Sequence, residues 1–264
     1  MSSFFRIIIP NNNSEPWIRH GLDTIVNQTF KDWELVIVDD ASVDNSPEII
    51  AEYAEKYPIT FIRLPKKKGF PGDVREEALK YATDSEYTLF LDSDDWFADN
   101  EVFEMVREKA EETHADVIRM PFLIYESASK ITPVVMTDKN IKEFVESPFV
   151  APWTKAVRTS KMQPFETQSI YDDILNHLLL ADTIDSIAYI EKPFCAVWNR
   201  QQTNQTSVTT DINGDEWKRR KYCASLFRMC ATCTITKFNR ECVQERADSW
   251  ANFAKTMIKQ ENLI

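Results

Sequence analysis

Short apolar runs and amphipathic patterns alternate along residues 1–125. Runs that are apolar at nearly every position predict strands buried on both faces, whereas apolar residues recurring every three or four positions predict helices. The predicted strands cover residues 5–9, 34–38, 60–64, 87–91 and 117–125. The predicted helices cover residues 14–26, 73–82 and 99–113, and a further one starts at Ser46. This order predicts an α/β fold with a mostly parallel central sheet flanked by helices.

The alternation weakens after residue 125, and the rest of the chain divides into two parts. Prolines break residues 126–210 into short pieces, apart from a helical pattern at 171–181. Residues 211–264 show a helical pattern to the end of the chain. We therefore expect a C-terminal helical extension after a single α/β domain.

Composition and charge narrow the possible partners. The formal net charge of -11 opposes general binding to nucleic acid or anionic lipid. Basic runs occur at 66–68 and 218–221, and we interpret both as solvated surface; the second follows Trp217 and is a candidate for peripheral membrane contact. No apolar run is long enough to span a bilayer and the N-terminus lacks signal-peptide features, so we expect a cytoplasmic protein.

Four of the five cysteines fall late in the chain. Cys230 and Cys233 form a C-x-x-C pair, a spacing that also occurs in zinc and redox sites. Helical spacing places both on one face with Cys223, which favours buried, reduced thiols in a helix core.

Two of the predicted strands end in acidic residues. Asp39–Asp40 follow the second strand, and Asp92, Asp94 and Asp95 follow the fourth. Because the carboxyl ends of parallel strands meet at one edge of a sheet, both groups are expected to face one crevice. Clustered carboxylates are ligands that Mg²⁺ and Mn²⁺ prefer. The alternative for the second group is a solvated turn that caps the helix predicted from Asp99.

Four segments in a fixed order carry a family resemblance. They read FRIIIPNNN, NQTFKDWELVIVDDASVDNS, GFPGDVREEAL and FLDSDDW, and weaker matches follow at APWTKAVR, PFETQSIYDDILNHLLL and CAVWNRQQTNQTSV. Together they resemble the nucleotide-sugar-dependent glycosyltransferases of family 2, which have the A-type fold. The resemblance implies a nucleotide-sugar-binding half at 1–125, an acceptor-binding half of the same domain at 126–210 and the extension at 211–264.

The resemblance also implies an activity. The chain is expected to be a metal-dependent, inverting glycosyltransferase that uses Mn²⁺ or Mg²⁺. Its donor is expected to be a nucleoside-diphosphate sugar, with a UDP-sugar favoured, and its acceptor the hydroxyl of a carbohydrate, lipid-linked or other compound. A single displacement assisted by one carboxylate base would invert the anomeric carbon.

The resemblance implies a role for each matched residue. The expected donor-binding residues are Pro10, Asn12, Asp40, Arg75, Asp92, Ser93 and Arg200. The expected metal ligands are Asp94 and Asp95. The expected base is Asp173, with Asp172 as its rival; the alternative for both is a negative charge that stabilises a helix N-terminus. The expected acceptor-binding residues are Trp153, Trp198 and His177.

Departures from the family pattern keep a second interpretation open. Glu76 follows Arg75 where the family often has asparagine, the turn at 11–13 lacks the usual aromatic residue, and the turn Asp40-Ala41-Ser42 lacks a common glycine. An inactive sugar- or nucleotide-binding module of the same fold is therefore the alternative. Phosphotransferases with a D-x-D motif carry it near the first strand, and sugar nucleotidyltransferases need a glycine-rich loop there; both classes fit this sequence less well.

Overall fold

The computed structural model describes residues 3–81, 84–136, 138, 140–147, 149–165, 172–191 and 193–200. The predicted C-terminal extension, the four late cysteines and the basic run after Trp217 lie outside the described residues. No helix among the described residues is long and apolar enough to cross a membrane.

The main sheet of the described chain has the strand order β10-β6-β9-β4-β1-β2-β3. Its strands are β1 (Phe5–Asn11), β2 (Trp33–Asp39), β3 (Ile59–Arg63), β4 (Tyr87–Phe90), β6 (Val117–Arg119), β9 (Lys155–Arg158) and β10 (Ile187–Tyr189). Only β9 runs antiparallel to its neighbours, so the prediction of a mostly parallel sheet is confirmed. The chain builds β1 to β3 in one direction and then adds β4 on the other side of β1. The strand order thus reverses next to β1, which is where open α/β sheets bind ligands.

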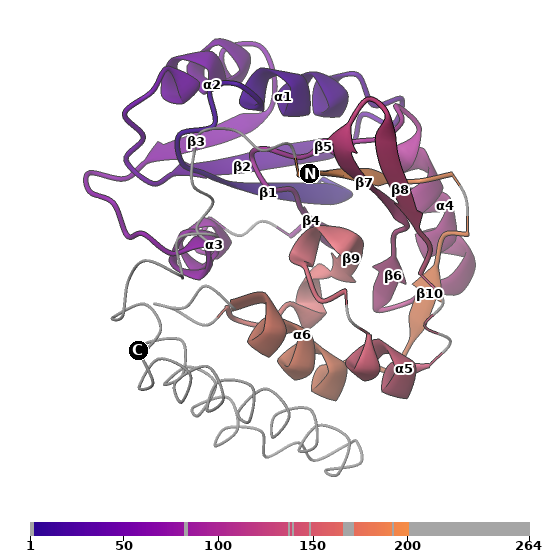
Figure 1. Cartoon of the computed structure of the whole chain (residues 1–264). Helices are drawn as coiled ribbons and strands as arrows, with labels where there is room; N and C mark the ends of the chain where they lie inside the picture. Colours follow the sequence, from indigo (N-terminus) through magenta and orange to yellow (C-terminus); the bar gives the residue numbers. More distant parts are fainter. Residues whose placement is uncertain are drawn as a thin grey trace, which may run out of the picture.

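Helices cover both faces of this sheet (Figure 1). The helices on one face are α1 (Ile18–Val26), α2 (Ser46–Ala54) and α4 (Val102–Thr113). The helices on the other face are α3 (Pro71–Leu79) and α6 (Asp172–Thr183), and α5 (Ile141–Glu146) packs against α6. Short 3₁₀ turns, η1 (Pro152–Thr154) and η2 (Thr159–Lys161), flank β9.

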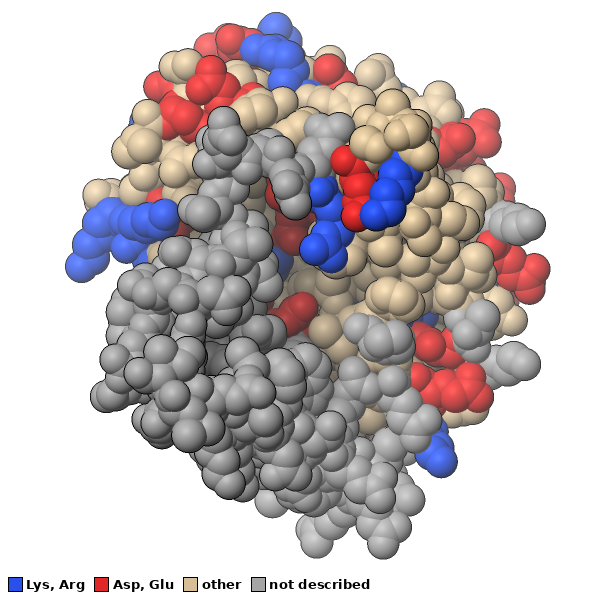
Figure 2. Space-filling view, viewed as in Figure 1, with Lys and Arg blue, Asp and Glu red and all other residues tan. Residues whose placement is uncertain are grey.

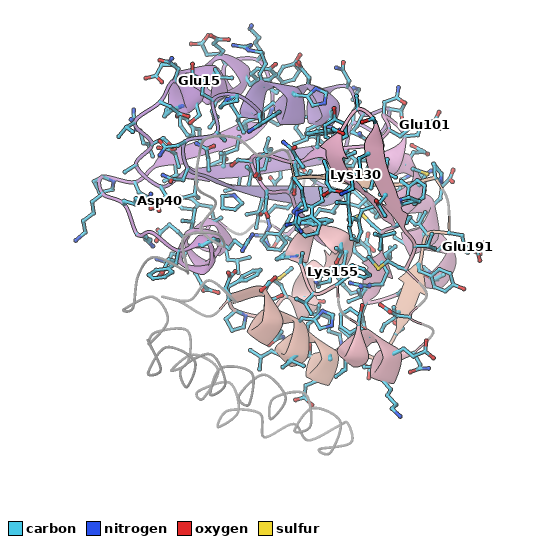
Figure 3. All side chains as sticks on the ribbon, viewed as in Figure 1. Glu15, Asp40, Glu101, Lys130, Lys155 and Glu191 are labelled. Atoms are coloured by element: carbon cyan, nitrogen blue, oxygen red, sulfur yellow. The ribbon has the colours of Figure 1, made fainter. Side chains whose placement is uncertain are left out.

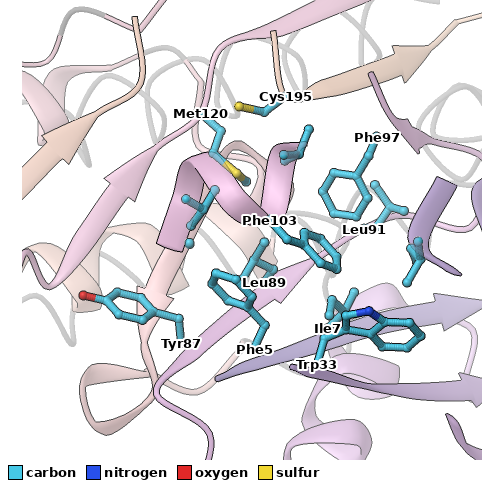
Figure 4. Packing of buried hydrophobic residues seen from close by; sticks show 14 of the residues in the cluster. Phe5, Ile7, Trp33, Tyr87, Leu89, Leu91, Phe97, Phe103, Met120 and Cys195 are labelled. Atoms are coloured by element: carbon cyan, nitrogen blue, oxygen red, sulfur yellow. The ribbon is translucent and has the colours of Figure 1, made fainter. Parts of the chain in front are cut away.

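Side-chain alternation along the strands explains why they read as continuous apolar runs. Phe5, Ile7 and Ile9 of β1 point into the core under α1 and α4, where the Phe5 ring packs against Phe103 (Figure 4). Ile8, between them, points to the opposite core under α3. Both faces are therefore buried, as the apolar runs predicted.

A second sheet explains one wrong prediction. The expected single strand at 117–125 is two strands: β6 stays in the main sheet, and β7 (Phe122–Ser127) joins β5 (Trp96–Phe97), β8 (Lys130–Val134) and β11 (Ala196–Asn199) in the order β5-β11-β7-β8. The chain changes sheets at Met120–Pro121, where proline has no N–H to continue a ladder.

Smaller differences concern helix starts and one cysteine. The helix predicted from Ser14 begins at Ile18, because residues 14–17 form a turn in which Trp17 N donates to Ser14 O at 2.9 Å. Asp99 lies before α4 and accepts a hydrogen bond from Glu101 N at 2.9 Å. Burial raises the pKa of the Cys195 thiol to about 12, so this cysteine is an inert core residue.

Candidate functional site

The acidic end of β2 is held by a dense set of hydrogen bonds. Asp39 is fully buried; its Oδ1 accepts from Asn11 Nδ2 at 2.7 Å and its Oδ2 from Ser42 N at 3.1 Å. Arg63 Nε lies 3.5 Å from the same Oδ2. Ala41, which follows Asp40, adopts a positive φ of 53°, a backbone conformation that glycine adopts more readily than alanine. Asp39 thus fixes the turn that presents Asp40.

Asp40 binds a basic loop beside the end of β1. Its Oδ1 accepts from Lys68 N at 2.6 Å and its Oδ2 from Gly69 N at 2.8 Å. Asn12 donates to the main-chain oxygen of Asp40 at 2.9 Å and accepts from Lys67 Nζ at 2.9 Å. Figure 3 shows Asp40 beside this loop, which leads to α3. The expected donor residues Asn12 and Asp40 are therefore in contact, next to the half-buried Pro10.

The carboxylates that follow β4 accept fewer hydrogen bonds from the protein than those at the end of β2. Asp95 is buried; its Oδ1 accepts from Asn199 N at 2.8 Å, but its Oδ2 has no hydrogen-bond partner among the described residues. Burial, followed by the charges of Asp94 and Asp92, raises the pKa of Asp95 well above its ordinary value. Crowding of this kind favours the binding of a positive charge.

Asp94 shows the same effect in a more open position. Its side chain is exposed, yet it lies among many protein atoms. This partial removal from water, and then the charge of Asp92, raise the pKa of Asp94 to about 6. The half-exposed Ser93 lies between these two aspartates in the chain. Figure 2 shows acidic atoms set back from the surface near the centre of this face, beside basic side chains.

Arg75 joins this cluster to α6. Its Nη2 lies 2.6 Å from Asp92 Oδ1 and its Nη1 lies 2.6 Å from Asp172 Oδ2. The arginine is only 5% exposed. Burial alone would lower the pKa of Arg75, but Asp172 and Asp92 hold it above its ordinary value. Residues from three elements far apart in the sequence therefore meet at one buried guanidinium.

The two candidate bases differ in their surroundings. Asp172 is 2% exposed and paired with Arg75. Burial raises the pKa of its carboxyl, and the Arg75 guanidinium opposes that rise. Asp173 is half-buried and lies next in the first turn of α6. Of the two carboxylates, Asp173 is the more accessible.

The expected acceptor residues fall into two groups. Trp198 on β11 packs against the buried Trp153 with ring centroids 5.9 Å apart, and the Arg200 guanidinium lies 4.6 Å from the Trp198 ring. His177 is fully buried between α5 and α6, where its Nε2 lies 2.7 Å from the main-chain oxygen of Phe144. An acceptor cannot reach His177 in this structure, and its ring packs on Phe144 instead.

Sequence reasoning did not single out two buried cations near the site. Lys155 is 1% exposed and donates to the main-chain oxygens of Val150 at 2.7 Å and Ala151 at 3.0 Å; Figure 3 labels it at the start of β9. Burial, and next the charge of Arg119, lower the pKa of Lys155 well below its ordinary value. Arg119 pairs with Asp138 at 2.8 Å. The segment APWTKAVR contained Lys155, but nothing in its spacing indicated that the lysine is buried.

The described residues do not form a complete metal cage. No group of three His, Cys, Asp or Glu side chains among them is arranged to hold a metal ion alone. Mg²⁺ and Mn²⁺ commonly bind through one or two carboxylates, with water and phosphate oxygens as the other ligands. The unpartnered Oδ2 of Asp95 and the exposed Asp94 fit that kind of shared site.

Curated relatives match a limited part of the chain. The poly(ribitol-phosphate) beta-glucosyltransferase of Bacillus spizizenii is 44% identical over 93 residues, which is 34% of this chain and 14% of that protein. The chain thus spans only a small part of the length of this relative.

Solved structures match almost the whole fold. The complex of Staphylococcus aureus TarS 1-349 with UDP-GlcNAc has a TM-score of 0.72 at 21% identity and covers 94% of this chain and 70% of that one. The mannosyltransferase PcManGT of Pyrobaculum calidifontis, in complex with GDP-Man and Mn²⁺, has a TM-score of 0.63 at 16% identity, covering 95% and 70%. At such identities these likenesses show the A-type fold.

A family model provides the broadest match in sequence. The model described as "Glycosyl transferase family 2" matches residues 6–172. That range contains the acidic ends of β2 and β4 and Arg75, and it ends one residue before Asp173. Because the match covers more than half of the chain, the protein belongs to glycosyl transferase family 2.

Proposed function

We propose that this protein transfers a sugar from a nucleoside-diphosphate sugar to an acceptor hydroxyl, with inversion and with the help of Mg²⁺ or Mn²⁺. The observation that carries the proposal is the Asp92–Arg75–Asp172 bridge, with both contacts at 2.6 Å. The bridge joins the aspartates after β4, where Asp95 Oδ2 has no hydrogen-bond partner among the described residues, to the first turn of α6. These aspartates lie beside β1, where the strand order of the sheet reverses. The proposed donor residues and the helix turn that carries the proposed base are thereby linked through Arg75.

The donor is proposed to bind at the ends of β1, β2 and β4. Pro10, Asn12 and Asp40 line the base and ribose side, and Arg75, Asp92 and Ser93 the side toward the diphosphate. We favour a UDP-sugar because the TarS relative was solved with UDP-GlcNAc, although PcManGT shows that the fold also accepts a GDP-sugar. Arg200, stacked on Trp198, can reach an anionic group from the opposite side.

Asp94 is proposed as the main metal ligand, and Asp95 as its support. Asp94 is exposed, whereas Asp95 already uses one oxygen to bind Asn199 N at 2.8 Å. A bound Mg²⁺ or Mn²⁺ would supply a positive charge that stabilises the diphosphate leaving group. A cation would also favour the ionised form of Asp94 and Asp95, whose pKa values are raised by burial and by neighbouring carboxylates.

Asp173 is proposed as the general base. It would accept the proton of the acceptor hydroxyl while the acceptor oxygen forms a bond to the anomeric carbon. The bond from that carbon to the diphosphate oxygen breaks, and the electron pair leaves with the nucleoside diphosphate. One displacement inverts the anomeric centre and requires no covalent nucleophile. Asp172 suits this role less well, because Arg75 already binds its carboxylate.

The acceptor is proposed to bind between the second sheet and α6, near Trp198. The half-buried indole of Trp198 offers a flat surface for a sugar or polyol. The poly(ribitol-phosphate) acceptor in the name of the Bacillus relative makes polyol-phosphate polymers the first acceptors to test. Glucose and N-acetylglucosamine are the corresponding donor sugars.

The replacement Asp173→Asn tests the proposal directly. It should lower transfer by on the order of 10² or more, the usual scale for loss of a general base, while UDP binding stays close to wild type. Transfer is measured as UDP release with UDP-glucose and UDP-GlcNAc in the presence of Mn²⁺. Unchanged turnover would remove Asp173 from the mechanism. Absence of turnover with every donor and acceptor, together with retained UDP binding, would favour the inactive binding module.

A further inference from the structure

Two consecutive residues of α3 contact the first residue of α6 and the segment that precedes it. Arg75 pairs with Asp172, the first residue of α6, at 2.6 Å. The next residue, Glu76, accepts a hydrogen bond from the main-chain N–H of Phe165 through its Oε1. The residue at which this chain departs from the family pattern therefore has a defined partner, and that partner is protein backbone.

Phe165 is itself fixed between α3 and β4. Its ring is 4% exposed and packs edge-on against Phe90, with centroids 5.1 Å apart. The Arg75 guanidinium lies 5.6 Å from the same ring. Phe90 ends β4, two residues before Asp92. The residue that Glu76 holds thus packs against the last residue of β4 and against Arg75, which pairs with Asp92.

A third link ties the same segment to α6. Asn176, one turn after Asp172, donates through Nδ2 to the main-chain oxygens of Gln163 at 2.7 Å and Pro164 at 3.3 Å. Asn176 is 3% exposed. α3 is therefore linked to the start of α6 in two ways: directly through Arg75 and Asp172, and indirectly through Glu76, the segment 163–165 and Asn176. Asp173 lies in the first turn of α6, between Asp172 and Asn176.

We propose that Glu76 is a positioning residue for the base. Together with Arg75 it fixes the first turn of α6 against the donor carboxylates, and so sets where Asp173 stands relative to the donor sugar. An asparagine at position 76 would be one methylene shorter and would not reach Phe165 N. The proposal rests on the proposed function, because it assigns a task to the environment of Asp173.

The expected effect is on turnover more than on donor binding. A shift of about 1 Å in a reacting group can cost on the order of 10² in rate. Glu76→Ala should therefore lower kcat by roughly 10- to 100-fold, while KM for the UDP-sugar changes by less than about twofold. Glu76→Gln keeps an acceptor oxygen at the same reach and should restore most of kcat. Glu76→Asn should behave like the alanine variant.

The test uses the full chain and two independent readouts. The first is steady-state kinetics with UDP-glucose or UDP-GlcNAc and Mn²⁺. The second is amide hydrogen exchange at Phe165, which needs no turnover. The matched control is Glu52→Ala: Glu52 is an exposed glutamate of α2, on the opposite face of the sheet, and pairs only with Arg19 in the described chain. If Glu76→Ala does not fold, Glu76→Asn takes its place.

Faster exchange at Phe165 with lower kcat in the alanine and asparagine variants, and recovery in Glu76→Gln, would support the proposal. Wild-type kcat in Glu76→Ala, a loss confined to KM, or failure of Glu76→Gln to recover would overturn it. If the wild type turns over no donor, the proposed function fails. Exchange at Phe165 then still decides whether Glu76 holds this segment, and unchanged exchange would reject that contact.

Discussion

The acidic ends of β2 and β4 carry similar residues in opposite environments. At the end of β2 the carboxylates of Asp39 and Asp40 accept hydrogen bonds from Asn11, Ser42 and the loop at 68–69. At the end of β4, Asp95 has an unpartnered buried oxygen, and the pKa values of Asp94 and Asp95 are raised. A carboxylate whose oxygens are satisfied by the protein organises structure, whereas one that is not is suited to an external positive charge.

The largest expected effect comes from removing the charge of Asp94. Asp94→Asn should lower Mn²⁺-dependent transfer by on the order of 10² or more, because a charge-stabilising ligand to the diphosphate site is lost. The midpoint of thermal unfolding should not fall, since the replacement relieves repulsion with Asp92. Asp99→Asn is the matched control: it removes the same charge from an exposed aspartate five positions on, and transfer should be unchanged. Equal losses in both variants would contradict a specific role for Asp94.

At the end of β2, removing a carboxylate is expected to lower the stability of the fold. Asp39→Ala should lower the free energy of unfolding by about 2–6 kcal/mol, since the Asn11 amide and the Ser42 N–H each lose an acceptor at about 1–3 kcal/mol. Urea unfolding monitored by circular dichroism measures the change. Asp39→Asn, which keeps one acceptor oxygen, should lose less. Full stability of Asp39→Ala combined with lost UDP binding would reverse the comparison and make Asp39 a ligand residue.

A smaller effect is expected where α1 supports the end of β4. A Cβ at Gly21 would lie 2.9 Å from the main-chain oxygen of Asp95, and backbone cannot yield as a flexible side chain does. Gly21→Ala should therefore cost about 1–3 kcal/mol of stability, as overpacking does. It should also weaken Mn²⁺-dependent UDP binding, because the turn at 92–95 must shift. Wild-type stability and binding would show that this turn tolerates movement.

Local patterns were enough to predict the main sheet up to β4. Each of those strands is an apolar run bounded by polar residues, and the observed bounds of β1 to β4 lie within two residues of the predicted ones. The second sheet was missed because β5 and β11 are short and pair across long sequence separations: β11 aligns with β7 through Ala196 and Phe122, and with β5 through Ala196 and Phe97. β9 was missed because it begins with Lys155, a buried charge that no strand pattern indicates.

The motifs predicted which residues belong to the candidate site, but not the contacts that these residues make with one another. Asp40, Asp92, Arg75 and Asp172 could be named from motifs, and the structure places the last three in direct contact. That Asp172 would be locked by Arg75 while Asp173 stays more open depends on the approach of α3 and α6. The same approach gives Glu76 its partner Phe165. Contacts of this kind join segments that are distant in the sequence, so the spacing of residues within one segment does not predict them.

Calorimetric titration of UDP into the 264-residue chain would show whether the carboxylates at 92–95 and a divalent cation together hold the diphosphate. UDP should bind at least about tenfold more tightly with Mn²⁺ than with EDTA, a difference of about 1.4 kcal/mol or more. The gain should disappear in Asp94→Asn. Equal UDP affinity with Mn²⁺ and with EDTA in the wild-type protein would contradict the account.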